Sequence, residues 1–184
     1  MARKPRPPAP GRSAGADLQS ILRVDHAGEY GAVRIYQGQI DVLAARRTAA
    51  RPLAAVRRMA EGEKEHLARF DEILPRYGVR PTLLRPLWWA AGYALGAGTA
   101  LLGTEAAMAC TAAVEEVIDA HYGRQLDRLE AGEVRDVIAQ FREDEISHRA
   151  EALAQGAERA PFYNAVRATI AAGCRLAIAL SERL

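Results

Sequence analysis

Residues 63–70 read EKEHLARF and residues 145–148 read EISH, so the chain carries two Glu-x-x-His pairs. In a helix, residues three apart lie on the same face, with about 5–6 Å between their β-carbons. Each pair can therefore direct a carboxylate and an imidazole toward one metal ion. Apolar residues recur at helical spacing around both pairs, which predicts that the pairs face the interior of a helical protein.

The rest of the composition also favours helices. Ala, Leu, Arg and Glu dominate the 184 residues, and strand-like alternation of Val, Ile, Thr and aromatic residues is almost absent. A chain of this length can form one domain with a substantial buried core. We therefore expect an all-α protein with a single folded domain over residues 17–184.

Several local signals place the helices. Asp17 is a candidate N-cap, Pro52 suits a first helical turn, and Gly78 suits a helix end. The apolar periodicity predicts the following helical segments: 17–47, 52–77, 108–129, 134–152 and 161–184. Residues 1–16 are basic and rich in proline, so we expect a disordered tail that is neither a secretory signal nor a mitochondrial presequence.

Two further glutamates, Glu29 and Glu115, lie on the apolar faces of two other predicted helices. Burying an ionised carboxylate costs free energy unless a cation or hydrogen-bond donors compensate for the lost water. Four carboxylates and two imidazoles form the ligand set of ferritin-like di-iron or di-manganese bundles. The sequence thus predicts a ferritin-like four-helix bundle with these metal ligands: Glu29, Glu63, His66, Glu115, Glu145 and His148.

The remaining polar residues near the six predicted ligands have weaker signals. Four glutamates lie off the apolar stripes and are expected on the surface: Glu61, Glu65, Glu116 and Glu143. Because a ligating histidine usually donates its second ring nitrogen to a carboxylate, Asp25 or Asp144 is a candidate partner. A helix cap or a surface charge is the alternative role for either residue. His26 is left without a role. His121, beside Tyr122, is either a core histidine or a carrier of protons or electrons to the metals.

The two cysteines and the overall charge exclude some classes. Cys110 and Cys174 lie within helical patterns and lack metal-ligand spacing, so we expect both in the core and disfavour zinc. Lys and Arg total 25 against 23 Asp and Glu, a net charge of +2, which gives no basis for nucleic-acid binding.

Residues 86–104, PLWWAAGYALGAGTALLGT, contain no charged side chain. Three interpretations are open: a helix that spans a bilayer, a helix buried in the bundle or in a dimer interface, and a segment that enters one leaflet. The cluster of Trp88, Trp89 and Tyr93 favours the last, because Trp and Tyr are enriched at headgroup depth. We expect additional membrane-associating contacts here, between Pro86 and Thr104.

Four segments resemble the demethoxyubiquinone hydroxylases: RVDHAGEYGAVRIYQGQ (23–39), EKEHLARF (63–70), LGAGTALLGTEAAMACTAAVEEVIDAHY (95–122) and AGCRLAIALSERL (172–184). The resemblance runs from about Ile21 to Leu184. The family's ligand pattern falls on the six residues that the helical spacing selects, and its His-Tyr pair falls on His121 and Tyr122.

The resemblance implies a di-iron monooxygenase that hydroxylates the ring of a polyprenylated demethoxyubiquinol with O2, late in ubiquinone biosynthesis. It implies two iron ions, electrons from NADH or the reduced quinone, and residues 86–104 as the entrance from the membrane. The resemblance is compatible with a complex with other ubiquinone-biosynthesis proteins and with a homo-oligomer. We expect a peripheral protein on the cytoplasmic face of a bacterial inner membrane, or the matrix face of the mitochondrial inner membrane in a eukaryote.

Two rival functions share the ligands. A ferritin-like protein that handles iron or scavenges peroxide would bind the same metals, but would not need the charge-free aromatic segment. A membrane-associated lipid-binding or assembly protein with a structural metal would keep the fold and show no oxygen-dependent turnover.

Overall fold

The computed structural model describes residues 14–47 and 49–183, and all regular secondary structure in these ranges is helical. The helices are α1 (Ala14–Ala45), α2 (Ala50–Arg76), α3 (Arg85–Leu101), α4 (Thr104–Leu126), α5 (Glu133–Ala154) and α6 (Tyr163–Ser181), with a short 3-10 helix, η1 (Ala157–Arg159), before α6. The all-α prediction is confirmed.

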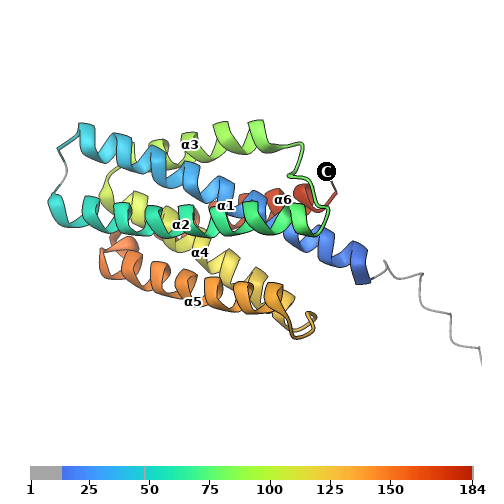
Figure 1. Cartoon of the computed structure of the whole chain (residues 1–184). Coiled ribbons are helices and arrows are strands. Elements are labelled where there is room, and N and C mark those ends of the chain that lie inside the picture. Colours follow the sequence, from blue (N-terminus) through green and yellow to red (C-terminus); the bar gives the residue numbers. More distant parts are fainter. Residues whose placement is uncertain (1–13, 48, 184) are drawn as a thin grey trace, which may run out of the picture.

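The helices form a bundle of two antiparallel pairs with two covering helices. Figure 1 shows α1 antiparallel to α2, and α4 antiparallel to α5. The third helix, α3, lies along α1, and α6 packs against α4. The four helices of the two pairs are those that carry the six predicted metal ligands.

The N-terminal boundary differs from the expectation. Helix α1 begins at Ala14, so Asp17 lies in its first turn instead of at its N-cap. The predicted disordered tail is therefore wrong for residues 14–16, and its residues 1–13 lie outside the described part of the chain. A carboxylate in the first turn still stabilises the helix, because it faces the positive end of the helix dipole.

Two glycines determine where helices end. Gly78 has φ +64°, the left-handed conformation that residues with a β-carbon rarely adopt, so the predicted end of α2 is confirmed. Gly103 has φ +126° and separates α3 from α4. The charge-free segment thus forms a helix of its own, which can lie beside α1 while α4 enters the bundle.

The apolar core is divided into layers along the bundle. One large cluster includes Tyr36, Met59 and Met108, and another includes Leu22 and Phe70. In α1 and α2 the predicted ligands come between the residues of these two clusters in sequence. The polar ligands therefore occupy a middle layer with closely packed apolar side chains on both sides.

Helix α3 approaches α1 closely through glycines. A β-carbon built on Gly96 would overlap the carbonyl oxygen of Ile35, and one built on Gly38 would overlap that of Tyr93. Helix α3 also exposes apolar side chains, including half of Trp89. Among the described helices, none combines the length and hydropathy needed to cross a bilayer, so the spanning interpretation of residues 86–104 is not supported.

We predict that Gly96→Ala lowers the free energy of unfolding by about 1–3 kcal/mol, since the added methyl group forces α3 away from α1. Gly98→Ala is the matched control, because a β-carbon at Gly98 meets nothing within 4 Å. The control should be neutral or stabilising by up to about 1 kcal/mol. Equilibrium urea unfolding measures both, and equal effects would contradict the close approach of the two helices.

Candidate metal centre

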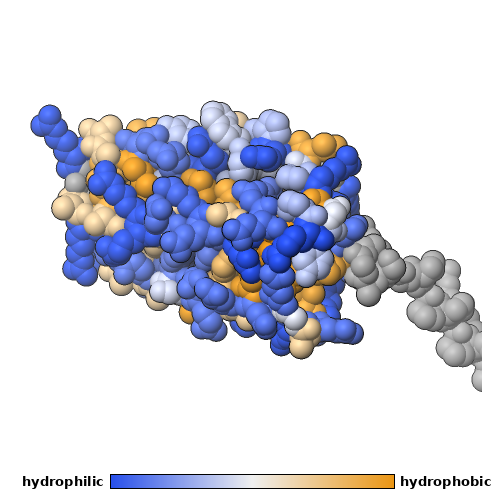
Figure 2. All heavy atoms as spheres, viewed as in Figure 1, coloured by the Kyte–Doolittle hydropathy of each residue, from blue (hydrophilic) through white to orange (hydrophobic). Residues whose placement is uncertain are grey.

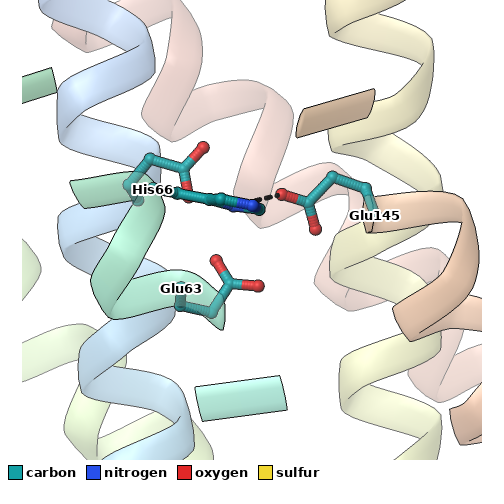
Figure 3. A group of neighbouring side chains, drawn as sticks. Glu63, His66 and Glu145 are labelled. Carbon is teal, nitrogen blue, oxygen red and sulfur yellow. Dashed lines mark ion pairs between the residues drawn. The ribbon is translucent and has the colours of Figure 1, made fainter. Parts of the chain in front are cut away.

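The six predicted ligands converge in the middle of the bundle. Glu29 comes from α1, Glu115 from α4, and the two Glu-x-x-His pairs from α2 and α5. Figure 3 shows Glu63 and His66 of α2 pointing toward Glu145 of α5. Five of the six side chains are buried, and that of His148 is 13% exposed.

The donor atoms form two overlapping groups, and the atoms of each group lie within 4.8 Å of one another. Both groups contain Glu63 and Glu145. The first group adds Glu29 and His66, and the second adds Glu115 and His148. Since a carboxylate has two oxygens, each shared glutamate can bridge two cations. The arrangement offers two adjacent positions, each with one imidazole and three carboxylates.

Several donor atoms in this centre are buried without hydrogen bonds to other described residues. They are Glu63 Oε1, His66 Nδ1, Glu145 Oε2 and His148 Nδ1. His148 Nδ1 lies 2.9 Å from Glu63 Oε1, close enough for an ion pair but in the wrong direction for a hydrogen bond. Unpaired buried polar atoms cost about 1–3 kcal/mol each. Divalent cations would satisfy all four, so the residues fit a two-metal centre.

The electrostatics of the centre support the same interpretation. Burial, together with the neighbouring carboxylates, raises the pKa of Glu63 and Glu115 well above their usual range. Burial also opposes the charge of Glu145, but the nearby imidazoles of His148 and His66 lower its pKa to about 2. Burial lowers the pKa of the His66 imidazole, but the nearby carboxylates of Glu145 and Glu29 raise it to about 10. Without cations, protons on Glu63, Glu115 and His66 therefore offset part of the negative charge of the centre.

One of the two candidate outer partners contacts a ligand. His66 Nε2 lies 3.2 Å from Asp144 Oδ2, and the His66 ring stacks on Phe141 with 3.9 Å between ring centroids. This contact leaves Nδ1 of His66 directed into the centre. The prediction for Asp144 is confirmed, and the structure adds the aromatic contact.

Asp25 has a different partner. Its carboxylate is buried, lies 3.3 Å from His121 Nε2, and accepts a hydrogen bond of 2.7 Å from Gln125. Of the two alternatives, Asp25 is thus the one that contacts no predicted histidine ligand among the described residues. Among the described residues, no hydrogen bond or ion pair joins His121 to any of the six predicted ligands. His26 is buried and paired with Asp71 at 3.0 Å.

Two tyrosines hold the outermost glutamates. Tyr36 donates a hydrogen bond of 2.7 Å to Glu115, and Tyr122 donates one to Glu29. Burial raises the pKa of both phenols, so they remain protonated donors. The sequence pattern assigned no role at the centre to Tyr36. The need of a buried tyrosine hydroxyl for a partner was the available signal.

The other sequence predictions near the centre have mixed outcomes. Glu61, Glu65 and Glu143 are exposed, as expected. Glu116 is partly exposed and pairs with Arg167 at 2.5 Å. The buried Cys110 agrees with a core position, and Cys174 is partly buried.

An apolar groove runs along another side of the bundle, between α1, α3, α4 and α6. Its cavity volume is about 390 Å³, and its lining contains no charged side chain. Gly28 and Val114 line the groove and are the neighbours in sequence of Glu29 and Glu115. An apolar molecule in the groove would thus lie next to two of the metal-ligand candidates.

Comparisons with known proteins agree with this arrangement. A family model described as "Ubiquinone biosynthesis protein COQ7" matches residues 16–181. A rat protein named NADPH-dependent 3-demethoxyubiquinone 3-hydroxylase, mitochondrial, is 51% identical over 91% of this chain and 78% of its own length. A Rhodospirillum rubrum protein named 3-demethoxyubiquinol 3-hydroxylase is 51% identical over 94% of this chain and 81% of its own. A yeast 5-demethoxyubiquinone hydroxylase is 39% identical over 92% and 79%.

We predict that Glu63→Gln abolishes the rise in melting temperature on addition of Fe²⁺ without air. The metal-free variant should melt near metal-free wild type, because the raised pKa already keeps Glu63 protonated and Gln has a similar shape. Glu61→Gln, on the exposed face of the same helix, should behave as wild type. Calorimetry with and without Fe²⁺ makes the measurement. Full stabilisation of Glu63→Gln by iron would contradict the assignment.

Proposed function

The chain belongs to the family of ubiquinone biosynthesis protein COQ7, and on this premise we propose that it is a di-iron monooxygenase that hydroxylates a polyprenylated demethoxyubiquinol. Two relatives that are each 51% identical to the chain have names that describe this hydroxylation. The observation that carries the proposal is the pair of overlapping ligand groups that share two glutamates.

The chemistry that two reduced iron ions supply is the activation of O2 for ring hydroxylation. In the balanced reaction one oxygen atom enters the ring as a hydroxyl group and the other leaves as water, with two electrons and two protons taken from a reductant. Carboxylate and imidazole ligands suit iron, and manganese is the alternative with the same donors.

The protein residues hold and orient this centre. Glu63 and Glu145 would bridge the two ions, with His66 and Glu29 on one and His148 and Glu115 on the other. The hydrogen bonds from Tyr36 and Tyr122 fix the outer carboxylates. Such outer contacts typically change metal affinity or activity by about 10–100-fold when they are removed.

The surroundings protect the reaction and connect it to the rest of the protein. The apolar layers on both sides of the centre exclude water, which limits side reactions of an activated oxidant.

We assign to His121 and Tyr122 the role of a proton or electron relay. The support is the hydrogen bond from Tyr122 to Glu29 and the adjacent buried pair of His121 with Asp25.

The apolar groove is the proposed binding site for the quinol. The prenyl chain is apolar, and the groove offers an uncharged surface that includes Gly28 and Val114, the neighbours in sequence of Glu29 and Glu115. Trp88 lines the groove, and α3 exposes about half of Leu87 and of Trp89. Exposed apolar and aromatic side chains of this kind suit a peripheral position on a membrane, from which the substrate would enter.

The reductant and the location are proposed more broadly. The mammalian relatives are named NADPH-dependent and mitochondrial, whereas the name of the Rhodospirillum rubrum relative specifies a quinol. Electrons from a nicotinamide nucleotide or from the quinol itself therefore both fit. We propose the inner membrane surface, bacterial or mitochondrial, as the location.

The rival functions explain less of the molecule. An iron-handling or peroxide-scavenging protein with the proposed ferritin-like fold would use the same ligands, but would have no need of an apolar groove. A protein with a merely structural metal would not need donors arranged for two adjacent cations. A homo-oligomer or a complex with other biosynthetic proteins remains compatible with the hydroxylase.

We predict that purified wild-type protein with iron, O2 and a reductant converts demethoxyquinol to its hydroxylated product. Glu145→Gln should reduce the rate to below about 1% by removing a bridging ligand. Glu143→Gln, exposed on the same helix, should keep the wild-type rate. Cells without the gene should accumulate the demethoxy precursor, which quinone profiling by mass spectrometry detects. Turnover by Glu145→Gln at the control rate would refute the assignment.

The groove generates a separate prediction. Gly173 lines it, and a β-carbon built there meets nothing within 4 Å. Gly173→Leu should therefore fill the groove without distorting the bundle, and lower kcat/KM about tenfold, mainly through KM. Gly98→Leu, on α3 and outside the groove lining, is the control. Unchanged kinetics of Gly173→Leu with normal iron content would exclude the groove as the quinol site.

A further inference from the structure

We propose that divalent cations reach the metal centre through a polar cavity between α2 and α5, which is separate from the quinol groove. This inference rests on the proposed metal centre and goes beyond it, because it assigns an entry route and the residues that line it. The polar cavity and the apolar groove have no lining residue and no helix in common.

The polar cavity has a volume of about 350 Å³ and ends at the nitrogen ligands. Of the six ligand candidates, His66 and His148 line it, and the four glutamates do not. The other lining residues are Gly62, Glu65 and Arg69 from α2, and Val137, Gln140, Phe141 and Asp144 from α5. A cation in the cavity would therefore be in contact with the imidazoles.

Two carboxylate residues, Glu65 and Asp144, line the cavity and can attract cations. Glu65 is exposed, Asp144 is 47% exposed, and both residues line the cavity. Arg69 is the one basic residue in the lining, and its guanidinium is engaged with Glu72 at 2.9 Å and Glu133 at 2.8 Å. The face that α2 and α5 present in Figure 2 is largely hydrophilic. A hydrated cation can thus approach without losing its water at once.

The apolar groove is a poor route for the same cation. Its walls carry no charged side chain, so an ion in transit would lose hydration without gaining ligands. That loss costs several kcal/mol per ion in a protein interior. The groove therefore suits the organic substrate, and the cavity suits the metal.

Within the cavity, His148 is the ligand that an entering cation meets first. It is the most exposed of the six, at 13%, and its Nε2 faces the β-carbon position of Gly62 at 3.2 Å. His66 is fixed on its outer side by Asp144 and Phe141. The described residues provide no hydrogen bond to the outer nitrogen of His148, so its ring has more freedom to admit an ion.

The test is the rate at which metal-free protein takes up Co²⁺, followed by stopped-flow absorbance. Glu65→Lys places a positive charge at the cavity and should slow uptake about fivefold or more at low ionic strength. The difference should shrink at high salt, where the Debye length is short. Glu61→Lys is the matched control, since Glu61 and Glu65 are exposed and each lies two residues from Glu63.

Equilibrium binding in the same samples separates the route from the metal centre. We expect two Co²⁺ per chain in wild type and in both variants. Equal uptake rates for Glu65→Lys and Glu61→Lys, with two Co²⁺ bound, would overturn the route and leave the centre intact. Slower uptake by Thr169→Lys, whose side chain lines the groove, would also overturn the route. Absence of Co²⁺ binding by wild type would overturn the centre and the route together.

Discussion

The repulsion between four carboxylates in a dry interior is the constraint on which the rest of the structure depends. Carboxylate and imidazole atoms lie within a few ångströms of one another between two apolar layers. Such a cluster is stable only when positive charge compensates for it. Protons fill this role without metal, as the raised pKa values of Glu63 and Glu115 indicate. Two divalent cations would fill it in the active protein.

The remaining elements position this centre and separate its functions. The two helix pairs bring the six ligands together, and the covering helices α3 and α6 form the apolar groove with α1 and α4. The sides formed by α2 and α5 remain polar. The proposed quinol groove and the proposed cation cavity thus reach the same centre from different sides of the bundle. This is possible because a bundle has gaps between several of its helices.

Much of the centre could be predicted from sequence because helical spacing is a local property. Two Glu-x-x-His pairs and two glutamates on apolar stripes were sufficient to select all six residues. The side chains that contact these six residues were harder to predict. Asp144 contacts a ligand and Asp25 does not, because the partner of a side chain depends on how neighbouring helices are rotated. Tyr36 was missed for the same reason. The position of α3 depends on the close approach of Gly38 in α1 and Gly96 in α3 to the opposite helix. No local sequence pattern specifies such a contact, because the two helices are far apart in the sequence.

The most direct test of the central claim is the anomalous scattering of crystals grown from iron-loaded protein. The account predicts two iron peaks about 3.5–4 Å apart, one bound by His66 and the other by His148, with Glu63 and Glu145 in contact with both. A single peak, or two peaks that share no carboxylate, would contradict it.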